Sequence, residues 1–118
     1  MKGDNISERL MVFAVASIGY AKAIPRNYLG RHVASQLIRS STSAGANYEE
    51  ARGAESRTDF AHKLGMSVKE LWESSYWLRL SNQAFNVDGD SAYRLNKESR
   101  ELVAILTASI KTARENAG

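Results

Sequence analysis

The scarcity of helix-breaking residues constrains this chain more than any other feature. Its 118 residues include one proline, Pro25, and eight glycines, of which Gly53 and Gly89 stand in loop-like surroundings. Proline and glycine are the residues that most often end or weaken a helix, so such a chain favours a few long helices. Apolar residues also recur at spacings of three and four along most of the chain, which is the period of an amphipathic helix. No β-type alternation of useful length interrupts them.

The periodic stretches and the turn-like segments between them predict four helices. They cover residues 7–24, 29–52, 56–84 and 90–115. Ser7 can cap the first helix and Pro25 can end it, because proline has no N–H to donate. Ser56 and Asp59 resemble a capping box at the start of the third helix, and Asp90 or Ser91 can cap the last.

The middle of the second stretch allows two interpretations. Residues 40–46 read Ser-Ser-Thr-Ser-Ala-Gly-Ala, a composition with poor helix propensity. Apolar and small positions nevertheless keep helical phase across the segment, and small side chains let two helix backbones approach closely. A helix is therefore predicted here, and a break between two shorter helices is the alternative.

Four helices with three short connections predict one all-α domain over residues 1–118, an antiparallel up-down-up-down four-helix bundle. The length suits one hydrophobic core, and 43% hydrophobic with 25% charged residues is ordinary globular composition. The absence of cysteine excludes disulfides and thiolate metal sites and favours a reducing, cytoplasmic setting. No apolar run reaches the roughly 18 residues that a membrane span requires, so no membrane association is expected.

Charge is distributed unevenly along the chain, although the net charge is only +3. No acidic residue lies between Glu8 and Glu49, and that interval contains five bases: Arg9, Lys22, Arg26, Arg31 and Arg39. Such a basic half can attract a polyanion, orient like subunits, or simply form a solvated surface. Arg9, Lys22, Arg26 and Arg31 are the candidate nucleic-acid contacts, although their spacing matches no named binding motif.

The residues that could carry chemistry do not form a recognisable catalytic or metal-binding pattern. Di-metal bundles require paired Glu-x-x-His motifs, whereas neither His32 nor His62 follows a glutamate by three residues. Glu70 and Glu73 share a helix face, which surface use explains as well. No catalytic residue, metal ligand or cofactor is therefore predicted, and a helical-bundle metal protein or enzyme is the alternative.

Three aromatic residues cluster on the predicted third helix: Trp72, Tyr76 and Trp77. Residues 76 and 77 point 100° apart on a helix, so the three rings cannot all face one core stripe. Either a thick core absorbs them or one ring is left for a partner.

The second helix and its neighbours resemble a known family. The run from Gln36 to Ala51 reads QLIRSSTSAGANYEEA, and Ser56, Asp59-Phe60, Lys63-Leu64, Lys69-Glu70 and Tyr76-Trp77-Leu78 follow it. Together these motifs are similar to the four helix bundle protein family, also called 23S rRNA-intervening sequence proteins, over residues from about 10 to 110. The chain departs from the family pattern at Ala44, where isoleucine is usual, and at Tyr48-Glu49, where Ile-Ala is usual.

The resemblance implies several properties that the residues alone do not. It implies protomers that assemble as a ring-like homo-oligomer, expected to be a homopentamer. It also implies similarity to the accessory protein of diversity-generating retroelements, which binds nucleic acid and a reverse transcriptase. Carried over by position, the family's polar signature consists of Gln36, Arg39, Asn47 and Glu50, which are expected to hold helix contacts or a subunit interface. The predicted function is thus a non-enzymatic nucleic-acid (RNA) binding or scaffold protein.

Overall fold

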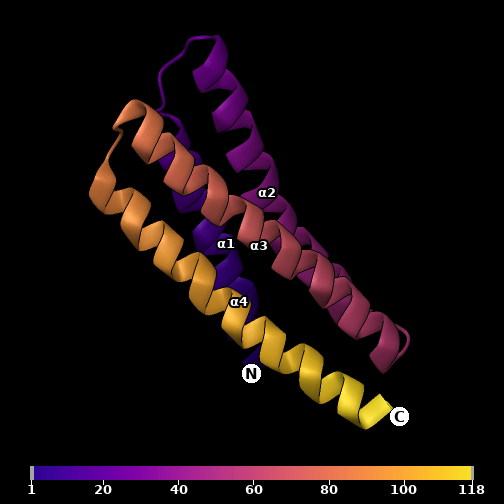
Figure 1. Ribbon diagram of the computed structural model, residues 1–118. Helices are drawn as coiled ribbons and strands as arrows, with labels where there is room; N and C mark the ends of the chain where they lie inside the picture. Colours follow the sequence, from indigo (N-terminus) through magenta and orange to yellow (C-terminus); the bar gives the residue numbers. More distant parts are fainter. Residues whose placement is uncertain (1, 118) are drawn as a thin grey trace.

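The computed structural model describes residues 2–117, with side chains from residue 5 to residue 116. Four helices account for almost all of it: α1 (Lys2–Ala21), α2 (Tyr28–Arg52), α3 (Arg57–Phe85) and α4 (Gly89–Ala117). No β-strand occurs within this range. Figure 1 shows the helices lying roughly along one long axis, with α3 and α4 in front of α1. The predicted all-helical, four-helix fold is confirmed.

The first helix is placed differently from the prediction at both ends. Ser7 lies inside α1 rather than at its N-cap, and its hydroxyl donates a hydrogen bond to the Glu49 carboxylate on α2. α1 ends at Ala21, before Pro25, because the chain tightens there into a turn in which the Ile24 N–H bonds to the Ala21 carbonyl at 3.1 Å. A residue preceding proline disfavours the α conformation, so the helix ends ahead of it.

Of the N-caps predicted for the last two helices, only the one at α3 is observed. Ser56 caps α3 as predicted, since its hydroxyl accepts the Asp59 N–H at 3.0 Å. At α4 the cap is Asp88, whose carboxylate accepts the Ser91 N–H at 3.1 Å, so the predicted cap at Asp90 or Ser91 was wrong. α4 begins at Gly89, one residue earlier than predicted, and this places Asp88 at the capping position.

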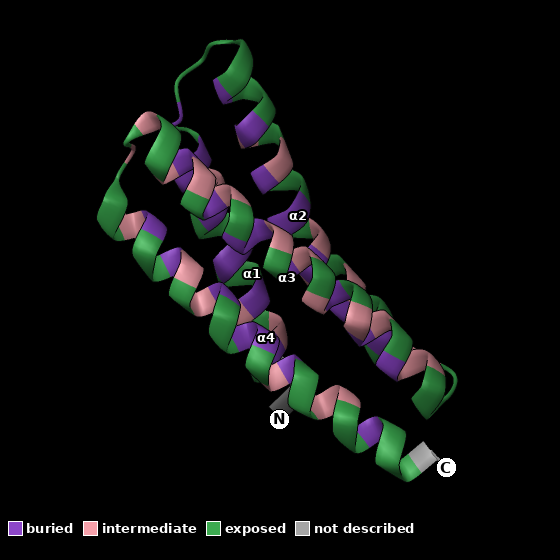
Figure 2. Cartoon of the chain, in the orientation of Figure 1, coloured by how far each residue is buried: buried purple, intermediate pink, exposed green. Residues whose placement is uncertain are grey.

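Each helix packs against two others: α1 and α3 both contact α2 and α4. Their shared core is dominated by leucines, of which Leu37, Leu64, Leu71 and Leu102 are fully buried. Figure 2 shows the buried residues as stripes along the helices that turn toward the centre. No helix among residues 2–117 combines the length and apolar character that a membrane span requires.

Buried serines draw α2, α3 and α4 together. The segment 40–46 is helical, which confirms the prediction over the alternative of a break. Ser67 donates to the Ala44 carbonyl at 2.8 Å, Ser74 to Ser40 Oγ at 2.9 Å, and Ser99 to the Leu71 carbonyl at 2.6 Å. These bonds cross between helices, so the serines satisfy their hydroxyls while their small size brings the backbones close.

Candidate functional site

The structure separates the four predicted nucleic-acid contacts into two groups. Arg9 on α1 reaches across to α4, where its Nε and Nη2 donate to the two Glu98 oxygens at 3.0 and 2.6 Å. Glu101 lies 3.7 Å from the same guanidinium. The hydrogen bond with Glu98 raises the pKa of Arg9. Two carboxylates therefore offset the charge of Arg9, which makes it a helix-to-helix contact.

Lys22, Arg26 and Arg31 form the second group, at the connection between α1 and α2. All three are exposed, and Arg31 Nη1 donates to the Arg26 carbonyl at 3.2 Å. Within the described part of the chain, no carboxylate forms an ion pair with any of them. This end of the bundle carries three cations available to an anion.

The polar family signature is centred on Arg39, which ties α2 to α3. Its guanidinium donates hydrogen bonds to the carboxylates of Glu70, at 3.2 Å, and Glu73. Its Nε donates to the side-chain oxygen of Gln36 at 3.1 Å. The hydrogen bond from Arg39 lowers the pKa of Glu73, and the Trp77 indole N–H donates to the same carboxylate at 3.3 Å. These residues therefore fasten helices together, which is a structural use.

The other two signature residues lie further along α2. Asn47 is half-buried and Glu50 is exposed. The structure places neither of them in the cluster around Arg39.

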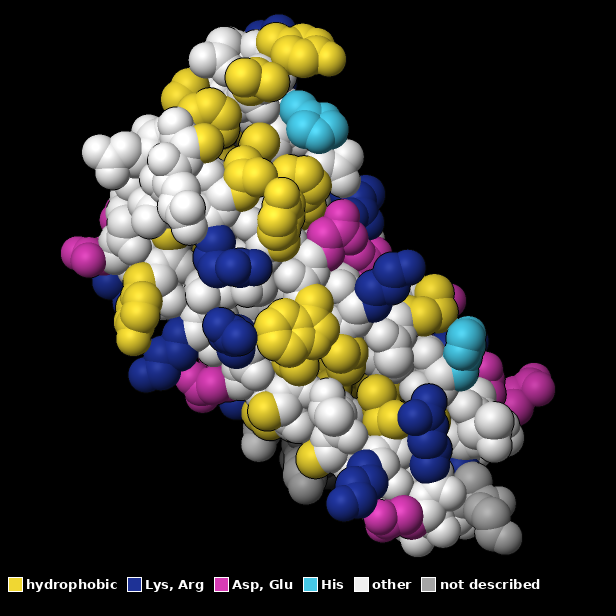
Figure 3. All heavy atoms as spheres, in the orientation of Figure 1, with side chains coloured by type: hydrophobic (Ala, Val, Ile, Leu, Met, Phe, Trp, Pro, Cys, Tyr) yellow, Lys and Arg dark blue, Asp and Glu magenta, His cyan; other side chains and the backbone are white. Residues whose placement is uncertain are grey.

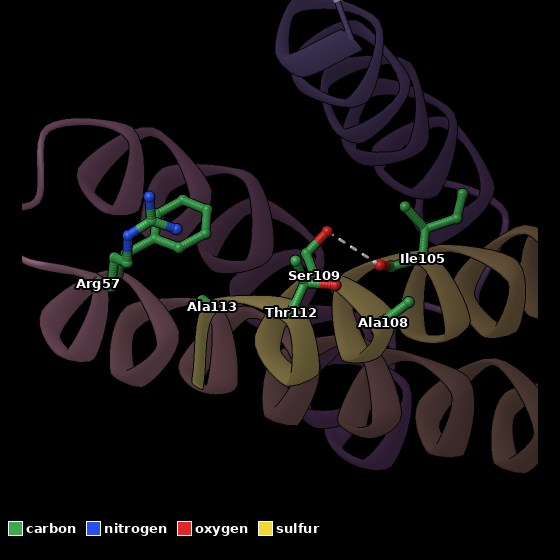
Figure 4. Close-up of a pocket in the computed structure, with 7 residues that line it drawn as sticks. Arg57, Ile105, Ala108, Ser109, Thr112 and Ala113 are labelled. Carbon is green, nitrogen blue, oxygen red and sulfur yellow. Dashed lines mark hydrogen bonds between the residues drawn. The ribbon is translucent and has the colours of Figure 1, made fainter. Parts of the chain in front are cut away.

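Groups that could support catalysis or metal binding do not converge among the described residues. His32 and His62 are both exposed, and no three His, Asp or Glu side chains of residues 5–116 lie close enough to share a metal ion. A groove of about 520 Å³ lies between the start of α3 and the end of α4 (Figure 4). It is lined mainly by apolar and small side chains, and its Ser109 hydroxyl donates to the Ile105 carbonyl of its own helix at 3.2 Å.

The outward side of α3 and α4 carries a surface that the sequence interpretation identified only through its aromatic residues. Its members are large aromatic side chains and cations that form no ion pair among the described residues, and we call it the basic-aromatic face: Lys69, Trp72, Tyr76 and Arg79 on α3 with Tyr93, Lys97 and Arg100 on α4. Figure 3 shows Lys and Arg side chains beside large hydrophobic ones over these two helices. Trp72 and Tyr76 are 46% and 49% exposed, so two rings, rather than one, are left outside the core.

A second missed surface is the outward side of α1. Met11, Val12 and Val15 expose 62%, 57% and 62% of their area, and Ala16 and Gly19 continue the same side. Spacings of one, three and four place these residues on one face, which we call the α1 stripe. In the sequence, the signal was an apolar run on positions next to the core stripe. That run made α1 more apolar than a helix with one buried side requires.

Comparison with known proteins places this helical architecture in a family. The family model described as 23S rRNA-intervening sequence protein matches residues 5–108. The chain belongs to this family. A crystal structure of a protein with unknown function from the S23 ribosomal protein family of Bacteroides thetaiotaomicron VPI-5482 is similar in fold, with a TM-score of 0.84 and 32% identity. The match covers 94% of this chain and 99% of that one. No curated protein matches.

Proposed function

We propose that this member of the 23S rRNA-intervening sequence family is a non-enzymatic scaffold that assembles with copies of itself and binds nucleic acid, with RNA as the expected ligand. The observation that carries the proposal is the α1 stripe. It lies in a segment without a charge from Leu10 to Ala21, about 17 Å along the helix. A contiguous apolar surface of this kind favours burial against another protein.

A second copy of the chain is the partner that the surfaces fit. A ring requires two different patches, one on each side of the protomer. The α1 stripe supplies one patch, and the groove beside Phe60 and Ile105 supplies an apolar hollow for the other. Arg57 lines that groove, and the stripe has Glu8 at one end and Lys22 at the other, so the Glu8 end carries the charge opposite to Arg57. This arrangement supports a ring-like homo-oligomer, and the family resemblance leads us to expect five protomers.

The proposal includes an antiparallel, up-down-up-down order of the helices within each protomer. The residue order of the contacts between helices supports it. Ser67 meets Ala44 whereas Ser74 meets Ser40, so residue numbers rise along α3 as they fall along α2.

Sedimentation equilibrium and light scattering test the assembly directly. We expect about five protomers for the wild type. Val15→Lys should yield a monomer with an unchanged helical circular dichroism spectrum, because an uncompensated ammonium in the interface would be desolvated. Ser35→Lys adds the same charge at an exposed position of α2 and should leave assembly intact. A wild-type monomer would refute self-association, and a dimer would refute the ring.

The nucleic-acid part of the proposal is supported by the three cations at the α1–α2 connection. Repetition of Lys22, Arg26 and Arg31 around a ring would turn a modest patch into a strong one. Counterion release makes phosphate binding fall steeply with salt, so Arg26→Ala with Arg31→Ala should weaken RNA binding and flatten its salt dependence. Fluorescence anisotropy on the assembled protein measures this. An absence of RNA and DNA binding at low salt would leave a purely protein-directed scaffold.

A further inference from the structure

We infer that the basic-aromatic face of α3 and α4 binds single-stranded nucleic acid, with unpaired bases stacked on Trp72 and Tyr76 and phosphates held by the cations around them. The inference rests on the nucleic-acid part of the proposed function. It assigns the ligand class and a surface that is distinct from the α1–α2 connection.

The α3 half of this face is continuous because of helix periodicity. Lys69, Trp72, Tyr76 and Arg79 follow one another at steps of three, four and three, which places them on one side of the helix. The run from Lys69 to Arg79 is about 15 Å long. A cation therefore stands at each end of a row whose centre is two aromatic rings one turn apart.

One contact and one shared cavity join the α3 row to α4. The Arg100 guanidinium lies over the Trp72 ring at 5.3 Å from its centroid, and this cation–π contact holds a charge beside the ring. At the other end, Arg79 and Tyr93 line the same cavity of about 140 Å³. The rows on α3 and α4 therefore form one surface, on which Lys97 and Arg100 flank the aromatic centre.

The two exposed rings differ from their neighbour Trp77 in what they contact. Trp77 is half-buried and its indole N–H is bound to Glu73, so its position serves the α2–α3 contact. Tyr76 leans edge-on against Trp77 with ring centroids 5.1 Å apart, which restrains the Tyr76 ring while about half of it stays exposed. Restrained, exposed rings are suited to stacking because little side-chain entropy is lost when a base docks.

Three carboxylates of the same two helices are bound to arginines of α1 and α2, whereas the exposed Glu101 lines a groove with Lys97 and Arg100 of this face. Glu70 and Glu73 are bound to Arg39 of α2, and Glu98 is bound to Arg9 of α1. The cations of the face, Lys69, Arg79, Lys97 and Arg100, form no ion pair with a carboxylate among the described residues.

The combination of rings and cations favours an unpaired strand over a duplex or an acidic protein. In a duplex each base is stacked on its neighbours, so its faces are not accessible to Trp72 or Tyr76. An acidic peptide would satisfy the cations but would leave the rings without a stacking partner. A single strand presents both phosphates and free base faces to the same surface.

Fluorescence anisotropy with labelled oligouridine, oligothymidine and an RNA duplex tests the inference. Each probe is about 20 nucleotides or base pairs long, so that it exceeds the site size of such single-strand-binding surfaces. We expect both single strands to bind more tightly than the duplex. Trp72→Leu and Tyr76→Leu should each weaken single-strand binding about 5- to 150-fold and leave duplex binding unchanged, whereas Trp72→Phe should retain stacking. Tyr28→Leu removes a ring that is 79% exposed beside Arg26 and Arg31, so an equal loss of single-strand binding in this variant would place stacking at the α1–α2 connection and overturn the inference.

Cation variants and a competitor distinguish the remaining outcomes. Arg79→Ala and Lys97→Ala should each reduce the salt slope for single strands by about 0.7. If only Arg26→Ala with Arg31→Ala weakens binding, the inference is overturned and the proposed function stands. If the leucine variants bind single strands as the wild type does, stacking is overturned. If the protein binds none of the three probes, this inference and the nucleic-acid part of the proposed function both fail, and binding of polyglutamate alone would assign the face to an acidic protein.

Discussion

Gly30 provides a sharp test of how the α1–α2 connection is built. Gly30 is buried in the first turn of α2, where its N–H is accepted by the Asn27 side chain at 2.8 Å. A Cβ at this position would lie 1.8 Å from the Pro25 carbonyl oxygen and 2.8 Å from its carbon. These are backbone atoms, so Gly30→Ala cannot be accommodated by a side-chain rotation, and the connection itself must move.

The magnitude follows from three opposing contributions. Overpacking of this kind costs about 1 to 3 kcal/mol, and displacement of Asn27 from the cap costs about 0.5 to 2 kcal/mol more. Alanine recovers about 1 kcal/mol of helix propensity. We therefore expect Gly30→Ala to lower the free energy of unfolding by about 2 kcal/mol net.

Gly65 supplies the matched control. It lies within α3, and a Cβ there would have no heavy atom within 4 Å apart from local helix backbone. Gly65→Ala should therefore raise the free energy of unfolding by about 1 kcal/mol. Urea titrations followed by circular dichroism measure both, at one fixed protein concentration because self-association would shift the apparent stability. A Gly30→Ala variant as stable as the wild type, or a destabilised Gly65→Ala variant, would refute the packing argument.

Two further predictions concern the contacts between helices. Because the pKa of Glu73 is lowered in the folded protein, Glu73 contributes stability above its usual pKa of about 4.3, and this contribution is lost as the pH falls through the lower folded value. Glu73→Gln should therefore flatten the pH dependence of the urea midpoint below pH of about 5. An unchanged pH dependence would contradict this. Ser67→Ala removes the 2.8 Å hydrogen bond to the Ala44 carbonyl and should lower the free energy of unfolding by about 1 kcal/mol in the same titration. Thr42→Ala, at an exposed position, should lower it much less. Equal losses of stability in the two variants would count against a special role for the buried hydrogen bond.

The helices themselves could be predicted from local patterns because those patterns report burial on one side of a regular element. The serine-rich segment 40–46 was the hardest case, and phase outweighed propensity there because the small side chains are buried where α2 meets its neighbours. Helix ends were less predictable. Ser7 has the chemistry of a cap, yet its hydroxyl is used by Glu49, a residue 42 positions away that no local pattern connects to it.

The candidate surfaces were less accessible from the sequence than the fold. Runs of charge along the chain indicated a basic first half. In the structure, however, Arg9 is paired with Glu98 of α4, and Arg39 is paired with Glu70 and Glu73 of α3. Exposure of part of the Trp72, Tyr76 and Trp77 group was predictable from their angular spacing. Which rings are exposed depends on Glu73 and Arg39, and these meet only when α2 packs against α3.

Few helix-breaking residues, four phased apolar stripes and a family signature are enough to specify the fold class and four long helices around one core. Which charges remain available and which apolar residues lie outside becomes visible when the helices are packed together. A helix pattern states how residues are placed around one axis, whereas charge pairing and exposure depend on the rotation and register of neighbouring helices. Those are set by packing among residues far apart in the chain, such as Arg9 with Glu98, and this packing pairs Arg9 and Arg39 with glutamates while it leaves other cations available at the α1–α2 connection and on α3 and α4.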